Sequence, residues 1–213
     1  MSFDIVIVSY GHKEEVEKIC NTLTQANIII VDNKGNISID PTDRLIFPVY
    51  LRNSGFAGGC NRGFKLVKSD YVLFMNPDIE GVDNALFEKL DKLILENPQF
   101  DIFGIHLLDE NSLTDHGGVG FDAKGNPGHY FYKQKDHPMA RRNREVDAIT
   151  AAFMVVKRKV FEDLGGFNEA YFNGLEDVDF CLRAREKGYR ILYLGEVEAI
   201  HTSKKSESRF DNE

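Results

Sequence analysis

The chain has 213 residues, of which 42% are hydrophobic, and this suits one domain with a sizeable core. Its net charge of −8 argues against a nucleic-acid-binding surface, which needs clustered lysine and arginine. No apolar run reaches the roughly 18–20 residues that span a bilayer, and the N-terminal MSFDIVIVSY lacks the basic segment that begins a signal peptide. Three widely spaced cysteines without a Cys-x-x-Cys pair predict neither a disulfide framework nor a zinc site, and they fit a reducing cytoplasm.

The first hundred residues alternate between strand and helix patterns. Apolar runs predict strands at residues 3–9, 27–31, 45–51 and 70–75, the third weakened by Pro48 or placed by it at a sheet edge. Helical spacing predicts helices at residues 12–26, 61–68 and 86–95. This order predicts an α/β fold with a mostly parallel sheet covered by helices on both faces. In such sheets ligands bind beyond the carboxyl ends of the strands, where Asp32, Asn53 and Asn76-Pro77-Asp78 lie.

The second half of the chain has a different texture. Residues 109–144 are rich in Gly, Asp, His and Asn, which predicts loops or hairpins over the sheet. After them come an apolar run at 146–156, helices at 159–164 and 176–187, and strands at 190–194 and 197–201. We find no repeat and no linker, so one domain is expected over 1–203, followed by a polar tail at 204–213.

Four glycines stand in NSGFAGGCNRGF, residues 53–64. The stretch does not match the phosphate-binding pattern G-x-x-x-x-G-K-[ST], and the first strand is followed by SYGHKEE rather than G-x-G-x-x-G. A Ser-His-Asp spacing and a G-x-S-x-G elbow are also missing. The glycines therefore indicate either a flexible turn before a helix or a backbone that passes close to a ligand.

Carboxylates with a chemical interpretation stand at two further places, one after an apolar strand and one after a loop. In FMNPDIEG, Asp78 leaves the end of a strand and could hold a hard divalent cation, although Asn-Pro-Asp is equally good turn chemistry. In YFNGLEDVDF, Glu176, Asp177 and Asp179 open a helix, where acidic side chains suit the positive dipole end and Asp179 can pair with Arg183. A carboxylate there could also serve as a general base.

Three other positions have a structural and a functional interpretation. His201 ends the last apolar strand and could complete a metal site near Asp78, or be an ordinary structural histidine. Asp32 could contact a ribose or base edge, or cap its turn. The basic run at Arg141, Arg142 and Arg144 could lie near a phosphate-bearing ligand, or form a solvated loop.

Together and in this order, these residues resemble the inverting family-2 glycosyltransferases of the GT-A fold, most closely their rhamnosyltransferase-like branch. The resemblance runs from residue 5 to His201. It is carried by VSY with VDN, NSGFAGGCNRGF, NPD, AAFMVVKR with FEDLGGFNEAYF, EDVDFCLRAREKGYRI and AIH.

The resemblance implies a role for each motif. Residues 1–100 would bind the nucleotide, and residues 101–203 would hold the acceptor and the catalytic groups. Asp177 would be the base, with Glu176 as the second choice, and Asp78 and His201 would bind Mg²⁺ or Mn²⁺. The implied donor contacts are Ser9, Tyr10, Asp32, Asn53, Gly55, Phe56, Ala57, Gly58, Asn61, Arg62, Asn76 and Asp78.

The implied reaction moves a sugar from a dTDP-rhamnose-like or UDP-sugar donor to a hydroxyl of a glycan or lipid-linked acceptor. It would take place in the cytoplasm, with the inner face of the membrane as an alternative location. Arg62 or the Arg141–Arg144 run would offset charge on the departing diphosphate, and the 109–144 loops would cover the acceptor. Asn76 replaces the first Asp of the family's Asp-x-Asp motif, which removes one negative metal ligand.

Three other functions remain open. The chain could be a nucleotide-sugar-binding module that has lost catalysis, although its acidic pair is intact. A sugar nucleotidyltransferase would carry a Gly-rich loop with Arg and Lys after the first strand, and SYGHKEE does not fit this pattern. A purely structural interaction domain would leave the ordered carboxylates unexplained. The oligomeric state is not indicated.

Overall fold

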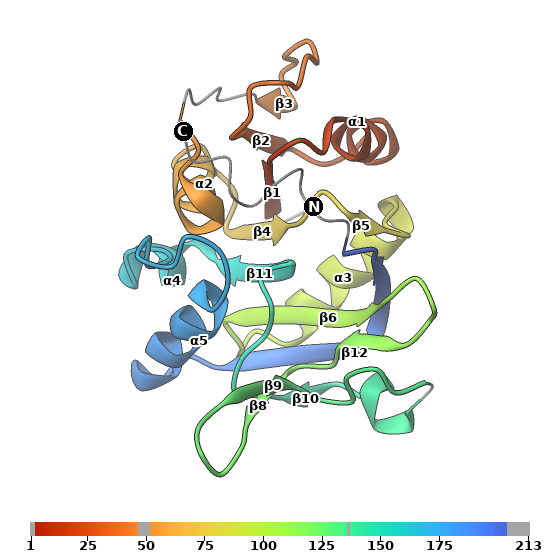
Figure 1. The fold of residues 1–213 in the computed structure, drawn as a ribbon, viewed down its shortest axis with the longest axis vertical. Coiled ribbons are helices and arrows are strands. Elements are labelled where there is room, and N and C mark those ends of the chain that lie inside the picture. Colours follow the sequence, from red (N-terminus) through yellow and green to blue (C-terminus); the bar gives the residue numbers. More distant parts are fainter. Residues whose placement is uncertain (1–2, 47–51, 136, 204–213) are drawn as a thin grey trace.

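A ten-stranded sheet runs through the protein, and helices cover both of its faces (Figure 1). The structure is a computed structural model and describes residues 3–46, 52–135 and 137–203. The strand order is β10-β12-β6-β11-β4-β1-β2-β3, with β5 paired to β12 and β7 paired to β6. Along this path β1, β2, β3, β4, β6 and β12 point one way, whereas β10 and β11 point the other way. The expected α/β fold with a mostly parallel sheet is therefore confirmed.

The elements have the following bounds. The sheet contains β1 (Phe3–Ser9), β2 (Ile28–Asp32), β3 (Leu45–Ile46), β4 (Tyr71–Met75), β5 (Ile79–Glu80), β6 (Ile102–Leu108), β7 (Thr114–His116), β10 (Arg144–Glu145), β11 (Phe153–Lys157) and β12 (Ile191–His201). A separate hairpin pairs β8 (Val119–Phe121) with β9 (Pro127–His129). The helices are α1 (Lys13–Thr22), α2 (Gly55–Phe64), α3 (Asn84–Glu96), α4 (Arg158–Asp163), α5 (Glu176–Glu186) and the 3₁₀ helix η1 (Pro138–Arg141).

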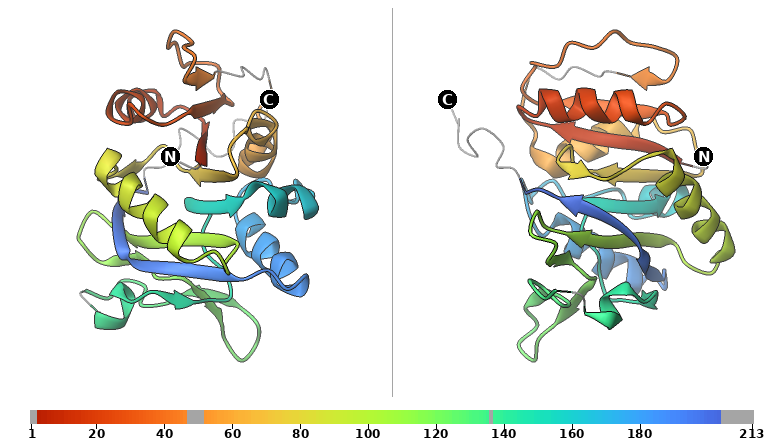
Figure 2. Two further views of the ribbon diagram at one scale, coloured as in Figure 1. Left: turned by 180° about the vertical axis from the view of Figure 1, so that it is seen from behind. Right: turned by 90° about the vertical axis from the view of Figure 1, so that its right-hand side faces the viewer.

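The alternating side chains of the strands build one apolar core on each face of the sheet. In β1, Phe3, Ile5 and Ile7 belong to the core that also contains the buried side of α1 and α3. Val6 and Val8 belong to the other core, with α2, α4 and α5. Because successive strand residues point to opposite faces, one short apolar run supplies both layers. Seen from behind, α1 and α3 lie on one side and α2, α4 and α5 on the other (Figure 2).

The helices match the expectations with two differences. The helix expected at 12–26 ends at Thr22, where β-branched threonines lower helix propensity. The helix expected at 61–68 begins at Gly55 and ends at Phe64, so the glycine stretch is itself a helix rather than a loop before one. The other three expected helices correspond to α3, α4 and α5.

The strands differ from the expectations in more places. Strand β6 was not expected because Gly104 and His106 interrupt its apolar pattern, yet a Cβ at Gly104 would lie 2.8 Å from Ile149 Cδ1. The two last expected strands form one strand, β12, with a register shift between Leu194 and Glu198. The apolar run at 146–156 becomes a strand only at β11. Of the strand expected at 45–51, β3 forms the beginning, and positions 47–51 with Pro48 lie outside the described residues.

Close packing accounts for the glycines of α2. A Cβ at Gly59 would lie 2.6 Å from Val8 Cγ1, and one at Gly63 would lie 2.5 Å from Val6 Cγ1. Gly55 has φ +70°, and its Cβ would lie 2.2 Å from the carbonyl oxygen of Phe172. Two of these glycines let the helix approach the sheet, and the third lets it approach the loop before α5.

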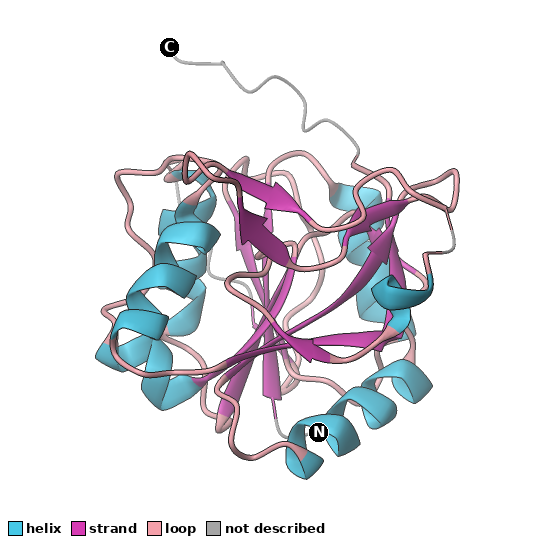
Figure 3. Cartoon of the chain, turned by 90° about the horizontal axis from the view of Figure 1, so that it is seen from below, coloured by secondary structure: helices cyan, strands magenta, loops and turns pink. Residues whose placement is uncertain are grey.

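The chain between β6 and β10 folds over the carboxyl edge of the sheet. It leaves the end of β6 and forms β7, the β8–β9 hairpin and η1 before it returns through β10. Viewed from below, the strands pass between the two groups of helices (Figure 3). Within the described ranges, no helix is both long enough and apolar enough to cross a bilayer.

Candidate functional site

A cavity of about 340 Å³ lies at the carboxyl edge of the sheet. Asn76 and His201 line it from the ends of β4 and β12, and Glu176 and Asp177 line it from the start of α5. Val119, Pro127 and His129 of the β8–β9 hairpin form another part of the wall, and Phe56 and Leu175 add apolar surface. Three motifs that lie far apart in the sequence therefore share one cavity.

The pairing of β5 with the end of β12 brings Asp78 to His201. Ile79 pairs with His201, and the carbonyl oxygen of Asp78 accepts a hydrogen bond from Thr202 N at 3.1 Å. As a result Asp78 Oδ1 lies 3.5 Å from His201 Nε2, and Asn76 Nδ2 lies 3.4 Å from the same nitrogen. The resemblance assigns Asp78 and His201 to one metal site, and the fold brings the two side chains together, whereas their binding of a metal stays a prediction.

Asp78 and His201 each stabilise the charged form of the other. Burial raises the pKa of Asp78, but the hydrogen bond and charge of His201 outweigh it and hold the pKa below its ordinary value. Burial likewise lowers the pKa of His201, but its hydrogen bonds to Asp115 and Asp78, together with their charges, raise it to about 9. At neutral pH the imidazole is therefore protonated, and a cation at Nε2 must displace that proton.

The donor set of this corner fits a divalent cation that a substrate helps to hold. Asp78 is buried and supplies carboxylate oxygens, while His201 supplies one imidazole nitrogen. Among the described residues, no group of three His, Cys, Asp or Glu side chains is arranged to bind a metal by itself. A diphosphate and water would therefore have to supply the remaining ligands, as is common for cations at phosphate-transfer and related sites.

The acidic pair lies at the first turn of α5. Asp177 Oδ2 accepts a hydrogen bond from Ala151 N at 3.0 Å, and its Oδ1 accepts one from Val178 N at 2.8 Å. Glu176 is buried, and burial together with the charge of Asp177 raises its pKa to about 7. Glu176 Oε2 has no hydrogen-bond partner among the described residues. Either carboxylate could therefore act as a base. Asp177 is held in a fixed orientation by two hydrogen bonds, and Glu176 has a pKa near neutrality.

The neighbouring Asp179 has the structural role that its spacing indicates. It pairs with Arg183 at 2.8 Å, and Arg183 also donates to the carbonyl oxygens of Leu164 and Gly166. The loop before α5 positions the acidic pair through an unusual turn, since Leu175 has φ +69° and Gly174 has φ +95°. Positive φ in a leucine is strained, and such strain is common at functional sites.

The nucleotide-side residues follow β1 and β2. Asp32 accepts hydrogen bonds from the backbone N–H groups of Lys34 at 3.0 Å, Gly35 at 2.8 Å and Ile37 at 2.7 Å. Its carboxylate therefore caps the turn, and a nucleotide contact by this residue stays a prediction. Ser9 is buried and its hydroxyl has no partner among the described residues, and Tyr10 follows it.

The residues expected from the glycine stretch fall into two groups. Phe56 lines the cavity, whereas Ala57 is buried in the core and Gly58 faces the Ser54 side chain. Asn61 donates to the carbonyl oxygen of Phe167 and accepts from its N–H, both at 2.9 Å, and also donates to Glu169.

The other two polar residues of the stretch, Asn53 and Arg62, make hydrogen bonds at or next to the start of α2. Asn53 Oδ1 accepts from Gly55 N at 2.9 Å, and Arg62 donates to the carbonyl oxygen of Arg52. The donor contacts expected of Asn53, Asn61 and Arg62 stay predictions.

The basic run at 141–144 is anchored to the fold. Arg141 pairs with Glu198 at 3.0 Å. Arg144 lies 4.4 Å from the centre of the Tyr193 ring and donates to the carbonyl oxygens of Met139, at 2.9 Å, and Gly117. Arg144 therefore holds together the segment between β6 and β10 (residues 109–143, the covering segment). A position of the basic run near a phosphate-bearing ligand stays a prediction.

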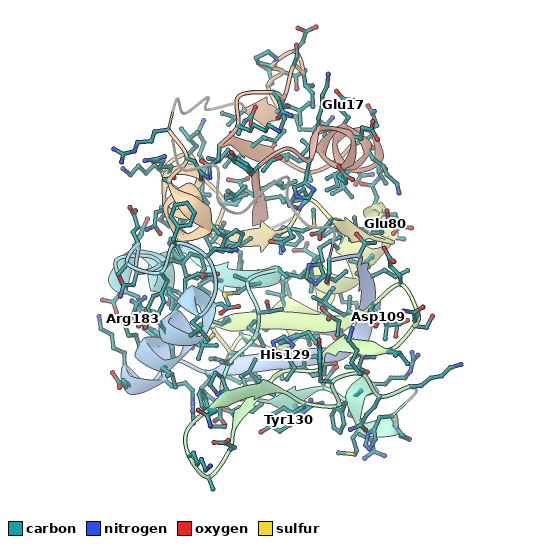
Figure 4. The ribbon with its side chains drawn as sticks, viewed as in Figure 1. Glu17, Glu80, Asp109, His129, Tyr130 and Arg183 are labelled. Carbon is teal, nitrogen blue, oxygen red and sulfur yellow. The ribbon has the colours of Figure 1, made fainter. Side chains whose placement is uncertain are left out.

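Three further polar residues beside the cavity were not expected from the sequence. Asp115, on β7, accepts a hydrogen bond from His201 Nδ1 at 2.8 Å. His129, at the end of β9 (Figure 4), donates from Nδ1 to the carbonyl oxygen of Asp115 at 2.7 Å, which leaves Nε2 of a neutral ring as an acceptor. Thr150 lines the cavity beside the backbone that binds Asp177. They lie in segments without a sequence period, so no local pattern marks them.

Comparisons with known proteins give one consistent result. The sequence profile of the family described as "Glycosyltransferase like family 2" matches residues 1–212. The O-antigen biosynthesis protein RfbC of Myxococcus xanthus is 30% identical over 149 residues, and the rhamnosyltransferase WbbL of Escherichia coli K12 is 26% identical over 229 residues. The structure of GalNAc-T7 with UDP, GalNAc and Mn²⁺ matches with a TM-score of 0.68 at 12% identity.

The matches cover most of this chain but different shares of the other proteins. The match to WbbL covers 92% of this chain and 82% of WbbL, and the match to RfbC covers 66% of this chain and 12% of RfbC. The match to GalNAc-T7 covers 95% of this chain and 44% of the other chain. This chain therefore corresponds to only part of several similar proteins.

Proposed function

Because the chain belongs to the family-2 glycosyltransferases, in their rhamnosyltransferase-like branch, and has the GT-A fold, we propose that it is an inverting hexosyltransferase. It moves a sugar from a nucleoside-diphosphate sugar to a hydroxyl of a glycan or lipid-linked acceptor. One observation carries the proposal: Glu176 and Asp177 line the same cavity as Asn76 and His201. A proton acceptor and a candidate diphosphate site thus share one cavity, as attack on an activated sugar requires.

In the proposed mechanism Asp177 removes the proton from the acceptor hydroxyl as that oxygen attacks the anomeric carbon. The bond from this carbon to the diphosphate breaks on the opposite face, so the configuration inverts. The hydrogen bonds from Ala151 N and Val178 N fix the orientation of the Asp177 carboxylate. Glu176, with a pKa of about 7, is the second candidate for the base because its Oε2 has no partner among the described residues.

Asp78 and His201 would hold a divalent cation together with the diphosphate oxygens. When bound, this cation neutralises the negative charge that develops on the departing diphosphate. We propose Mn²⁺ before Mg²⁺ because Mg²⁺ prefers oxygen ligands, whereas one of the two protein ligands here is an imidazole. GalNAc-T7, a structural neighbour, has been solved with Mn²⁺ and UDP.

The donor and its surroundings complete the proposal. The likeness to the rhamnosyltransferase WbbL favours a dTDP-rhamnose-like donor, with a UDP-sugar as the alternative. The nucleotide would lie at the ends of β1 and β2, beside Ser9 and Tyr10. The β8–β9 hairpin would cover the acceptor and exclude water, which would otherwise hydrolyse the donor. We propose the cytoplasm as its location, since its three cysteines are buried and unpaired.

A donor panel tests the proposal. The protein is heated with Mn²⁺ and each of a set of dTDP-, UDP- and GDP-sugars, and the melting temperature is compared with that of the free protein. A donor at a hundred times its dissociation constant should raise the melting temperature by roughly 5–10 °C. Asp78→Ala should abolish this shift. If no donor changes the melting temperature with or without metal, the proposed function is wrong.

A further inference from the structure

His201 lies between two carboxylates that face different nitrogens of its ring. Asp78 Oδ1 is 3.5 Å from Nε2, whereas Asp115 Oδ2 is 2.8 Å from Nδ1. The contact to Asp115 is thus the better-formed hydrogen bond of the two. The Nε2 side, with Asn76 also at 3.4 Å, faces the candidate cation site. Asp115 bonds to the other nitrogen of the ring, so it cannot share a cation at Nε2.

A β-bulge aims Asp115 at the histidine. In the antiparallel pair of β6 and β7, Leu107 pairs with His116 and Leu108 pairs with Thr114, so Asp115 is the extra residue of β7. A bulge turns the extra side chain out of the regular alternation, and bulges are common beside active sites. The carbonyl oxygen of Asp115 accepts from His129 Nδ1 at 2.7 Å, which holds the bulge from its other side.

We propose that Asp115 is a positioning residue for His201. It accepts the hydrogen bond from Nδ1–H, so the unprotonated nitrogen of the neutral ring is Nε2, and it fixes the ring so that Nε2 faces Asp78. Carboxylates commonly orient metal-binding histidines in this way, and their removal weakens metal binding roughly 10- to 100-fold. The inference rests on the cation site of the proposed function, and it adds a residue from the covering segment to that site.

A merely structural role is the competing explanation, because the same bond also ties the covering segment to β12. The chain offers a matched control for this role. Tyr193 Oη donates to the carbonyl oxygen of Ala140 at 2.7 Å and so ties the same segment to β12 without a bond to Asp115 or His201. Tyr193→Phe should loosen the segment, whereas only a change at Asp115 should release the imidazole ring.

The test measures Mn²⁺ binding by electron paramagnetic resonance, with the full chain and either dTDP or UDP present. The variants are Asp115→Ala, Asp115→Asn, Tyr193→Phe, His201→Ala and the double variant that combines Asp115→Ala with His201→Ala. Asp115→Ala should weaken Mn²⁺ binding roughly 10- to 100-fold. Asp115→Asn keeps an oxygen that accepts from Nδ1–H, so its loss should be smaller. In the His201→Ala background, Asp115→Ala should have no further effect, since it acts through the ring.

The outcomes separate this inference from the proposed function. Unchanged Mn²⁺ affinity in both Asp115 variants, with a loss in His201→Ala, would overturn the positioning role and leave the cation site intact. An equal loss in Tyr193→Phe and Asp115→Ala, or an added loss in the double variant, would also overturn it. If the unaltered protein binds no Mn²⁺ with either nucleotide, the metal part of the proposed function fails and the inference fails with it. Should Asp115→Ala not fold, Asp115→Asn and the control variants decide the question.

Discussion

Helix α2 and the segment from β6 to β10 reach the same edge of the sheet, but they contribute to the protein in different ways. The glycine-rich sequence of α2 is its most conspicuous local feature, and the contacts of these glycines are mainly with Val6, Val8 and the loop before α5. The covering segment has no comparable pattern, yet Asp115 and His129 lie beside the cavity. A conspicuous local sequence can thus be explained by close packing of a helix, whereas residues outside any local pattern can lie at the candidate functional site.

The largest expected effect is on catalysis in the cavity that the second region helps to line. Asp177→Asn should lower sugar transfer roughly 100- to 10,000-fold, because the amide cannot take the proton of the acceptor. Donor affinity should stay close to that of the unaltered protein, whereas the melting temperature should fall by a few degrees, because the amide nitrogen of Asn cannot accept from Ala151 N or Val178 N. Release of nucleoside diphosphate from the donor found in the panel measures the loss. Asp179→Asn is the matched control on the same helix, since Asp179 pairs with Arg183. Equal rates in Asp177→Asn and the unaltered protein would remove Asp177 from the role of base.

At α2 the expected effect is on folding. Gly59→Val should destabilise the protein by about 3 kcal/mol, because its side chain would overlap Val8 in a filled core. Urea unfolding measures the change in free energy. Gly128→Ala is the control, because a Cβ there has no neighbour within 4 Å and the expected change is within about 0.5 kcal/mol. A Gly59→Val variant that unfolds like the control would show that α2 does not need this close approach.

Glu176 should make stability depend on pH. Its folded pKa of about 7 lies above the ordinary value of 4.5, so the folded state holds the proton more tightly than the unfolded chain. This contribution is fully present below pH 4.5 and is lost as the pH rises through 7. At pH 8 the buried charge costs up to about 3 kcal/mol. Glu176→Gln should therefore unfold like the unaltered protein at pH 4 and be more stable at pH 8, as measured by urea unfolding. Equal gains at both pH values would contradict the raised pKa.

The sequence predicts the candidate functional residues that stand at the end of a strand or at the start of a helix. Asp78, Asp177 and His201 were expected at strand or helix ends, and the topology brings those ends to one edge. Asp115 could not be expected, because its position depends on a bulge between β6 and β7 and on a partner far along the chain. The sequence does not predict strand β6 for a related reason. Gly104 interrupts its apolar pattern because a side chain there would overlap Ile149, which is distant in the sequence. Local periodicity therefore predicts elements and their ends, while tertiary pairing decides which polar side chains meet.

The smallest expected effect concerns Asn61. The resemblance assigns this residue to donor binding, whereas in the structure its side chain makes hydrogen bonds within the protein. Its amide joins α2 to Phe167 and Glu169 through hydrogen bonds of 2.9 Å. Asn61→Ala should lower the free energy of unfolding by about 1–2 kcal/mol, since Phe167 N loses its partner. Donor affinity, measured by calorimetry at a temperature where the variant is folded, should stay within about twofold, a difference of about 0.4 kcal/mol. Phe56→Ala is the contrasting change, because Phe56 lines the cavity and should affect donor or acceptor binding more than Asn61 does. If Asn61→Ala loses donor affinity at unchanged stability, α2 contacts the nucleotide directly and the contrast between the two regions no longer holds.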